Sequence, residues 1–345
     1  MIARSRRARL LRHAALALGS LLFAASVCEG LILYALSHPR VVPRLPANVQ
    51  RGLRYLYTFY DRDIVQLEPA FARFDPELSY TLRPGRFVFA NREFANEFRV
   101  NSLGVRDEES ALVDPEVVVT GDSFAMGWGV GQEQTFARLL ERKLGLKVLN
   151  ASVSSYGAAR ELKLLDRVSF ARVKYVVIQH CENDFEEDEP FAEFARSHGA
   201  LPADTEARFE RRQARFLANR RYWFGRYLFR LLFHSRRDGA AGEPDAPPDW
   251  TRRAERLLEL LAHGSKQNLD GVQLILFDLG SDPEFVRALD RLRARPSWPR
   301  FIQRMKVLDV SAILYESHFY ILDDHLNASG HERLAAALAD AIRAR

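Results

Sequence analysis

The 345-residue sequence predicts an α/β fold with a parallel five-stranded sheet. From residue 116 onward, short runs rich in β-branched residues alternate with amphipathic stretches of helical period. The short runs lack polar alternation, which is typical of strands that are buried on both faces. Right-handed strand–helix–strand units of this kind build a flavodoxin-like three-layer sandwich.

The elements of this fold can be placed along the chain. Five strands are expected within residues 116–120, 147–153, 174–180, 272–280 and 306–314. The stretches with helical period are residues 134–145, 157–170, 251–267, 283–295 and a last one from about 328. Residues from about 185 to 250 break this rhythm, so we expect them to form a helical insertion in the domain.

The N-terminal segment has the composition of a membrane anchor. Residues 1–13 contain five arginines and no acid, and residues 14–36 are apolar apart from Glu29. As a helix, these 23 residues would reach roughly 34 Å, enough to cross a hydrocarbon core of about 30 Å. The arginines should stay cytoplasmic, which predicts a single-pass inner-membrane protein with an extracytoplasmic, periplasmic domain. A cleaved signal peptide is the alternative, because small residues stand at 24–26 and 35–37.

These features predict three regions. Residues 1–37 form a cytoplasmic tail and a transmembrane signal-anchor, residues 38–110 a proline-containing linker and an N-terminal extension, and residues 111–345 the α/β domain. Cys28 and Cys181 are too few for a disulfide framework. The composition, 47% hydrophobic and 28% charged, excludes general disorder.

The net charge of +5 is unevenly distributed. Residues 1–13 carry +5 and residues 208–237 carry +9, which leaves −9 for the remainder. This distribution argues against an evenly basic nucleic-acid-binding surface. In residues 208–237 the aromatics Phe209, Phe216 and Trp223 recur every seven residues. Three interpretations stay open: an amphipathic helix packed on the domain, a helix lying on an anionic bilayer surface, or a site for a polyanionic substrate.

Polar residues follow the first three predicted strands and precede the last predicted helix. The clusters are Gly121-Asp122-Ser123, Asn150-Ala151-Ser152, residues 181–184 and residues 322–331. Ligands of parallel α/β sheets bind beyond the carboxyl ends of the strands. The sequence therefore predicts a functional site built from these clusters.

A serine at such a strand end permits acyl transfer through a serine ester. We expect Ser123 to be the nucleophile and His325 to be its base, because imidazole has an ordinary pKa of about 6.5. A carboxylate beside His325 would fix its tautomer and stabilise the imidazolium. The backbone N–H groups of Ser123 and Ser152 and the Asn183 amide are the expected oxyanion donors.

The motifs GDSF, NAS, END and DDHLNASGH, in this order, resemble the four sequence blocks of the SGNH (GDSL-like) hydrolases. The resemblance covers the chain from about Glu116, and RVNSLGVRD at 99–107 resembles a segment of bacterial membrane-anchored members. It implies a flavodoxin-like sandwich that hydrolyses or transfers ester-linked acyl groups without metal or organic cofactor. By block, Ser123 corresponds to the nucleophile, Asn183 to the oxyanion-hole amide, and Asp323 with His325 to the acid–base pair.

The sequence departs from the family pattern at three places. Ser152 stands where the second block usually has glycine, and Cys181 replaces the glycine of the third block, which should reshape the pocket near Asn183. The usual Asp-x-x-His spacing would fall on a leucine. We therefore expect Asp323 to be the acid, because the side chain of Asp324 should point away from the imidazole.

Together these observations predict a serine esterase that removes O-acyl groups, acetyl above all, from a cell-envelope glycan or lipid. The alternatives are an O-acyltransferase with the same residues and a non-catalytic envelope-binding protein on a degenerate scaffold. His180 and Cys181 are adjacent and not at metal-ligand spacing, so we expect no metal site. The expected partners are the acylated substrate and the membrane. His331 lies within the last helix and is expected to be structural.

Overall fold

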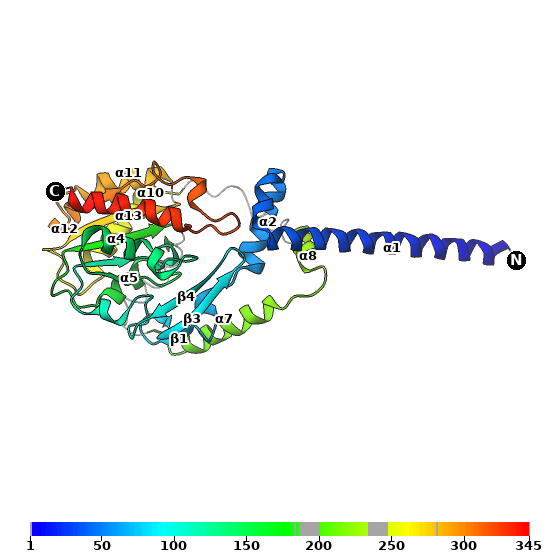
Figure 1. Ribbon diagram of the computed structural model, residues 1–345, viewed down its shortest axis with the longest axis horizontal. Coiled ribbons are helices and arrows are strands. Elements are labelled where there is room, and N and C mark those ends of the chain that lie inside the picture. The colour runs from blue at the N-terminus through cyan, green and yellow to red at the C-terminus, as the bar shows by residue number, and fades with distance from the viewer. Residues whose placement is uncertain (1, 183, 186–200, 234–247, 281, 345) are drawn as a thin grey trace. The chain divides into compact units, whose positions relative to one another are not determined.

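The computed structural model describes residues 2–182, 184–185, 201–233, 248–280 and 282–344 (Figure 1). The chain divides into two compact units. The smaller unit contains Met1–Arg62, Ala218–Asp245 and Ile321–Asp323, and the larger unit contains Asp63–Leu217, Ala246–Tyr320 and Asp324–Arg345. The three regions predicted from the sequence, residues 1–37, 38–110 and 111–345, were defined by composition and not by contacts. Their boundaries stay a prediction.

The larger unit is built on a five-stranded parallel sheet, as predicted. Its strand order is β6-β5-β7-β8-β9, so the first strand along the chain lies between the second and the third. The strands are β5 (Val117–Thr120), β6 (Val148–Asn150), β7 (Tyr175–Cys181), β8 (Gln273–Leu279) and β9 (Lys306–Leu308). This is the flavodoxin-like order, and it confirms the predicted α/β fold.

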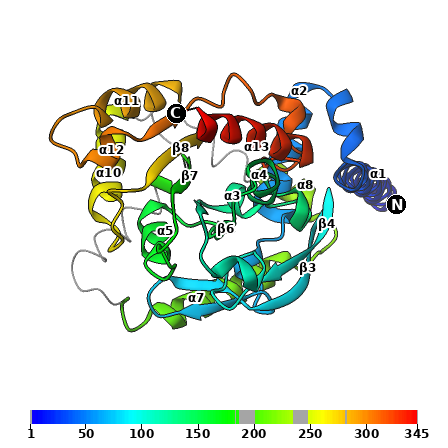
Figure 2. The ribbon, with the colours of Figure 1, turned by 60° about the vertical axis from the view of Figure 1, so that its left-hand side comes forward.

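Helices cover both faces of the sheet, which explains why its strands are mainly apolar (Figure 2). Val117, Val119 and Val177 belong to a buried cluster with α4 (Phe136–Leu144) and α13 (Ala328–Arg343). The neighbouring strand residues, such as Val118 and Ile178, belong to the opposite cluster. That second cluster includes residues of α5 (Ala158–Leu165), α10 (Trp250–His263) and α11 (Pro283–Arg293). Nearly all residues of β5 to β8 are therefore buried, whereas those of the edge strand β9 are half-buried.

Between residues 72 and 100 the chain forms two antiparallel hairpins, which were not predicted from the sequence. They are β1 (Ala72–Asp75) with β2 (Ser79–Leu82), and β3 (Gly85–Asn91) with β4 (Phe94–Val100). Phe89 and Phe98 of the second hairpin are buried in one cluster with Met126 and Trp128. This extension is therefore part of the α/β unit and packs against the segment that follows Ser123.

The remaining short elements of the larger unit are helical turns. They are η3 (Val65–Leu67), η4 (Glu109–Leu112), α3 (Ser123–Met126), η5 (Gln132–Gln134), α12 (Arg300–Gln303) and η6 (Glu316–His318).

The arginine-rich segment at 208–237 forms two helices instead of one. The first, α7 (Thr205–Arg220), packs on the larger unit through Phe209, which is buried and stacks on Tyr80 with ring centroids 5.6 Å apart. This part of the segment agrees with the interpretation of an amphipathic helix packed on the domain. The second helix, α8 (Arg226–Phe233), belongs to the smaller unit, and residues 234–237 lie outside the described residues.

The smaller unit contains the long apolar helix α1 (Ile2–Ser37), followed by η1 (Pro39–Arg44), α2 (Ala47–Leu56) and the π-helical turn η2 (Tyr57–Asp61) (Figure 1). Within α1, the 29 residues Arg9–Ser37 are long and apolar enough to cross a membrane by length and composition. The core of this unit is small. It consists mainly of Leu36, Val42, Leu53, Leu56, Tyr57, Tyr227 and Leu322.

His331 connects two helices of the larger unit. It lies on α13, is buried, and accepts a hydrogen bond at Nδ1 from the backbone N–H of Phe136, 3.1 Å away. Burial lowers the pKa of His331 to about 3, and the nearby positive charge of Arg106 acts in the same direction. The residue therefore stays neutral in the folded protein and has a structural contact, as the sequence suggested.

This contact predicts a pH dependence of stability. The folded-state pKa lies below the ordinary value, so the stabilisation is present above pH 6.5 and is lost as the pH falls. Below that value, His331 alone should cost roughly 1.4 kcal/mol of unfolding free energy per pH unit. His331→Asn keeps an acceptor for the Phe136 N–H and does not titrate. The unfolding free energy of the full chain is measured by denaturant unfolding in detergent at pH 7.5 and pH 5. Between these pH values it should fall less for His331→Asn than for the wild type. An equal fall in both proteins would contradict the assignment of His331 as a buried neutral residue.

Candidate active site

Ser123 occupies the first position of α3, directly beyond the end of β5. The intervening Gly121 has to be glycine, because a Cβ there would lie 2.6 Å from Gln179 Oε1 and 2.7 Å from the Ala125 Cβ. The chain can turn this tightly only without a side chain at that position. The buried strand therefore ends in a turn that brings a serine hydroxyl to the carboxyl edge of the sheet.

Two side chains hold this turn. The buried amide of Gln179, on the neighbouring strand β7, accepts hydrogen bonds from the backbone N–H groups of Asp122 at 3.0 Å and Ala125 at 3.3 Å. The Asp122 carboxylate accepts a bond from the Phe124 N–H at 2.9 Å and thereby caps α3. The backbone around Ser123 is fixed by bonds that do not involve the Ser123 hydroxyl.

The structure brings Ser123 and His325 together, although they are 202 residues apart in the sequence. The distance from Ser123 Oγ to His325 Nε2 is 2.7 Å, and both residues are buried. The imidazole contacts two aromatic rings. It stacks on Trp128 at a centroid distance of 4.8 Å and contacts Phe124 at 4.6 Å. These two rings limit the orientations that the imidazole can adopt.

The two predicted carboxylates have different surroundings. Asp324 Oδ1 lies 3.1 Å from His325 Nδ1, and the Asp324 side chain is 64% exposed. The expectation that Asp324 points away from the imidazole is therefore wrong. Asp323 belongs to the smaller unit, where it is buried, accepts a hydrogen bond from the Tyr57 hydroxyl at 2.6 Å and lies 3.7 Å from Arg62. Its assignment as the acid stays a prediction.

The predicted oxyanion donors are described only in part. Ser152 is fully buried, and its flanking N–H groups are bonded to β5 and its turn, Ala151 to the Val119 carbonyl at 2.7 Å and Val153 to the Gly121 carbonyl at 3.2 Å. The loop that carries Ser152 is thus attached to the backbone that precedes Ser123. Asn183 lies outside the described residues, so its role as an oxyanion donor stays a prediction.

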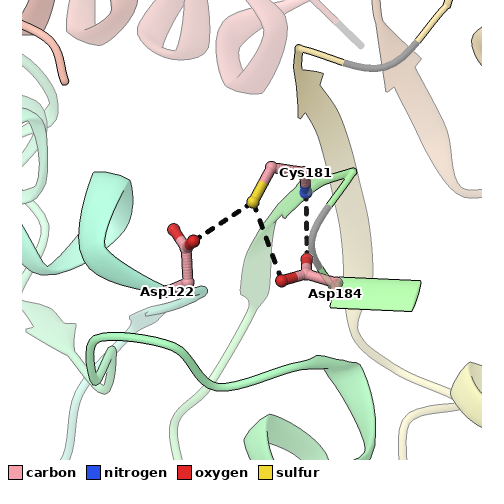
Figure 3. A group of neighbouring side chains, drawn as sticks. All are labelled: Asp122, Cys181 and Asp184. Atoms are coloured by element: carbon pink, nitrogen blue, oxygen red, sulfur yellow. Dashed lines mark hydrogen bonds between the residues drawn. The ribbon is translucent and has the colours of Figure 1, made fainter. Parts of the chain in front are cut away.

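Cys181 lies between two carboxylates (Figure 3). Its Sγ is 3.1 Å from Asp122 Oδ2 and 3.7 Å from Asp184 Oδ1, and its backbone N–H donates to Asp184 Oδ2 at 2.9 Å. Burial raises the pKa of the thiol well above its ordinary value, and the charge of Asp122 adds to this effect. The thiol is therefore protonated and can donate to Asp122.

The same three side chains could also bind a metal ion, because their potential ligand atoms lie within 4.8 Å of one another. Metal binding would require the thiolate; without an ion, burial keeps this thiol protonated. Hydrogen bonds within the group account for its arrangement. Cys181 therefore connects the turn after β5 to the end of β7, at the position where the family pattern has glycine.

Arg106, from the segment RVNSLGVRD, is fully buried beneath the loop that follows α3. Its guanidinium donates to the carbonyls of Gly127 at 2.5 Å and Val130 at 2.7 Å, and to Gln132 Oε1 at 3.1 Å. It also lies 3.7 Å from the ring centroid of Phe98. Burial lowers the pKa of Arg106 to about 9. The group holds the loop that places Trp128 under His325.

The next residue, Asp107, supports the second strand end. Its carboxylate accepts the backbone N–H of Asn150 at 2.8 Å, and the Asn150 amide donates to the Ala125 carbonyl at 2.9 Å. Burial raises the pKa of Asp107 to about 6. A continuous chain of hydrogen bonds therefore links this segment, the end of β6 and the helix that carries Ser123.

Sequence reasoning missed three of these residues: Gln179, Arg106 and Trp128. A glutamine inside the apolar run YVVIQHC of β7 is a usable signal, because a buried amide needs backbone partners. Arg106 was noted only as part of a motif. Its partners are carbonyl groups, which every residue carries, so the sequence does not identify them.

No family model and no curated protein matches the sequence. Among solved structures, the chain is similar to a protein of Desulfitobacterium hafniense DCB-2 assigned to the lipolytic G-D-S-L family, with 14% identity, TM-score 0.34, and 65% of this chain and 98% of that chain covered. It is also similar to TesA, with 14% identity and TM-score 0.31, and the match covers 66% of this chain and 97% of TesA. A third similarity is to a carbohydrate esterase whose active site displays divergent catalytic and non-catalytic binding functions, with 13% identity, TM-score 0.35, and 67% and 69% covered. The fold assignment rests on the strand order.

The contacts of Arg106 predict a large effect of its removal. Arg106→Met leaves buried carbonyl oxygens without donors, at a cost of about 1–3 kcal/mol each, so the unfolding free energy should fall by at least about 2 kcal/mol. The matched control is Arg86→Met on β3, since the Arg86 side chain is 67% exposed. Denaturant unfolding of both full-length variants tests this. Equal stability of the two variants would show that Arg106 does not hold the loop.

Proposed function

We propose that this protein is a membrane-tethered serine esterase that removes O-acyl groups, acetyl above all, from a cell-envelope glycan or lipid. The observation that carries the proposal is the 2.7 Å contact of Ser123 Oγ with His325 Nε2, in a turn at the carboxyl edge of a parallel sheet. A hydroxyl so placed can lose its proton to the imidazole as it attacks a carbonyl carbon.

The reaction would proceed in two halves. Ser123 Oγ bonds to the acyl carbon while its proton moves to His325 Nε2, and the carbonyl oxygen becomes an oxyanion held by N–H donors. Collapse of this intermediate breaks the bond to the leaving alcohol, which takes the proton from His325. A water molecule then gives its proton to His325 as it attacks the acyl-enzyme, and the carboxylic acid is released with Ser123 restored.

The base needs a carboxylate that holds the proton on Nδ1, and two candidates exist. Asp324 Oδ1 lies 3.1 Å from His325 Nδ1, but water screens an exposed pair and weakens it. Asp323 is buried and its carboxylate is fixed by the Tyr57 hydroxyl. We assign the orienting role to Asp323, because a fixed and desolvated carboxylate stabilises an imidazolium more strongly.

An O-acyltransferase is the second candidate function. Ser123 is 8% exposed and His325 is 6% exposed, and such burial limits the access of water to an acyl-serine. A sugar hydroxyl in place of water would take the acyl group with the same residues. Comparing free acid released with acyl groups transferred to an added glycan distinguishes the two activities.

The proposed location is the extracytoplasmic face of the inner membrane, with α1 retained as a signal-anchor. The support is the basic segment before the apolar helix and the length of that helix. The catalytic domain would then act on envelope material close to the bilayer.

An activated serine should react with a fluorophosphonate probe. We expect labelling of the full-length chain in detergent, loss of labelling in Ser123→Ala, and a decrease of at least about 100-fold in rate in His325→Gln. Ser311→Ala, at an exposed serine, is the matched control and should label like the wild type. A folded wild-type chain that does not label would favour the non-catalytic, envelope-binding alternative.

The two carboxylates can be separated by neutralising each in turn. Asp323→Asn should lower the rate of fluorophosphonate labelling by about 100-fold or more, because the wrong imidazole tautomer is then favoured. Asp324→Asn should change it by less than about tenfold, since its pair with His325 is exposed to water. The reverse order of effects would assign the acid to Asp324.

A further inference from the structure

Glu29 is the one acidic residue in the apolar stretch 14–36. A carboxylate is costly inside a membrane and needs partners there. Among the described residues of α1 its position is unusual, because it is only 1% exposed while the helix around it is largely exposed. The burial results from contact with the segment that begins at Ala218, which belongs to the same compact unit.

The partners of Glu29 are on α8 and the loop before it. Glu29 Oε2 accepts the backbone N–H of Leu228 at 2.8 Å, and Oε1 accepts the N–H of Tyr227 at 3.2 Å. The Tyr222 hydroxyl lies 3.3 Å from Oε1. Tyr227 and Leu228 are in the first turn of α8, where N–H groups have no partner within the helix and the helix dipole is positive. Glu29 therefore caps α8 from a different helix.

This contact fixes the position of α8 along α1. Glu29 lies eight residues before Ser37, the last residue of α1, which corresponds to about 12 Å along the helix axis. The first turn of α8 is bonded at this level. If α1 crosses the bilayer, the start of α8 lies within the membrane or at its boundary, and not in the aqueous space beyond it.

The side chains that this segment leaves exposed fit such a position. Within residues 222–233 the exposed side chains are aromatic or leucine, namely Tyr222, Trp223, Phe224, Phe229, Leu232 and Phe233, and the preceding Arg221 is exposed as well. Tryptophan and tyrosine are typical of the boundary between lipid and water. On α1, Val27 and Leu31 near Glu29 are also exposed.

The polar groups of the segment are engaged within the smaller unit. Arg226 donates to the carbonyl oxygens of Arg220, at 3.0 Å, and Tyr60. The Tyr227 hydroxyl bonds to the Asp61 carboxylate, and the Arg230 guanidinium lies 4.7 Å from the ring centroid of Tyr60. These contacts hold the positive charges of α8 on protein groups and leave its apolar face to its surroundings.

We propose that residues 222–233 are embedded in the lipid bilayer beside α1, in the leaflet nearer the C-terminal end of α1, and that Glu29 holds them there. The occupant of the exposed aromatic face is lipid, at the boundary of headgroups and acyl chains. The proposal rests on retention of α1 in the membrane and is independent of catalysis at Ser123. It makes the anchor a pair of helices, α1 and α8.

Tryptophan quenching by brominated lipids tests the embedding directly. The full-length chain is reconstituted in vesicles whose lipids carry bromine at a shallow or a deep acyl position. The chain has four tryptophans, Trp128, Trp223, Trp250 and Trp298, so Trp223→Phe identifies the signal of Trp223. With bromine at the shallow position, we expect the tryptophan fluorescence of the wild type to be quenched more than that of Trp223→Phe. For the wild type, shallow bromine should quench this fluorescence more than deep bromine. Equal quenching of wild type and Trp223→Phe would overturn the proposal.

The role of Glu29 is tested in the same vesicles. Glu29→Ala removes the cap and should reduce the Trp223-dependent quenching by half or more, while Glu29→Gln keeps one acceptor oxygen and should retain part of it. The matched control is Cys28→Ala, at the exposed neighbouring position. Unchanged quenching in Glu29→Ala would show that Glu29 does not hold the segment. Ser123→Ala should quench like the wild type, so a failed esterase assay and a failed embedding are distinguishable.

Discussion

The candidate site depends on a buried positive charge that takes no part in the proposed chemistry. Burying a guanidinium is expensive unless its donors are satisfied, and Arg106 satisfies them on the loop after α3, the helix that carries Ser123. The same donors allow the carbonyls of that loop to be buried. The loop is thereby held in one conformation. As a result, the ring of Trp128 stacks on the imidazole of His325. The position of the base is thus set by a residue in the extension that precedes the sheet.

Around this group, buried polar side chains connect strand ends that lie far apart in the sequence. Gln179 on β7 holds the turn after β5, and Asp107 with Asn150 links the end of β6 to α3. Each of these bonds joins a side chain to a backbone group, so each fixes the course of the chain. Such a network keeps donors and acceptors in place before a substrate arrives, which is the condition for electrostatic catalysis.

Much of the fold was predictable because the sheet is buried on both faces. The runs VVVT and YVVIQHC are continuous apolar strands, and their order along the chain leaves few possible topologies. The hairpins at 72–100 were not predictable, since their strands are partly exposed and their buried residues pack against distant parts of the chain, such as Trp128 for the second hairpin. In the site, motifs located Ser123 and His325. The direction of the Asp324 side chain was predicted wrongly, because it depends on local backbone angles that the residue order alone does not specify.

The stacking of His325 on Trp128 has a consequence for the charge that the imidazole carries. The two rings are nearly parallel, with an interplanar angle of 17° and centroids 4.8 Å apart. The face of an indole is electron-rich and attracts a cation placed above it, with about 0.5–2 kcal/mol of stabilisation depending on solvation. An imidazole that gains a proton here becomes such a cation. Trp128 therefore does more than orient the neutral imidazole. The attraction between the indole and the imidazole strengthens when the imidazole becomes charged.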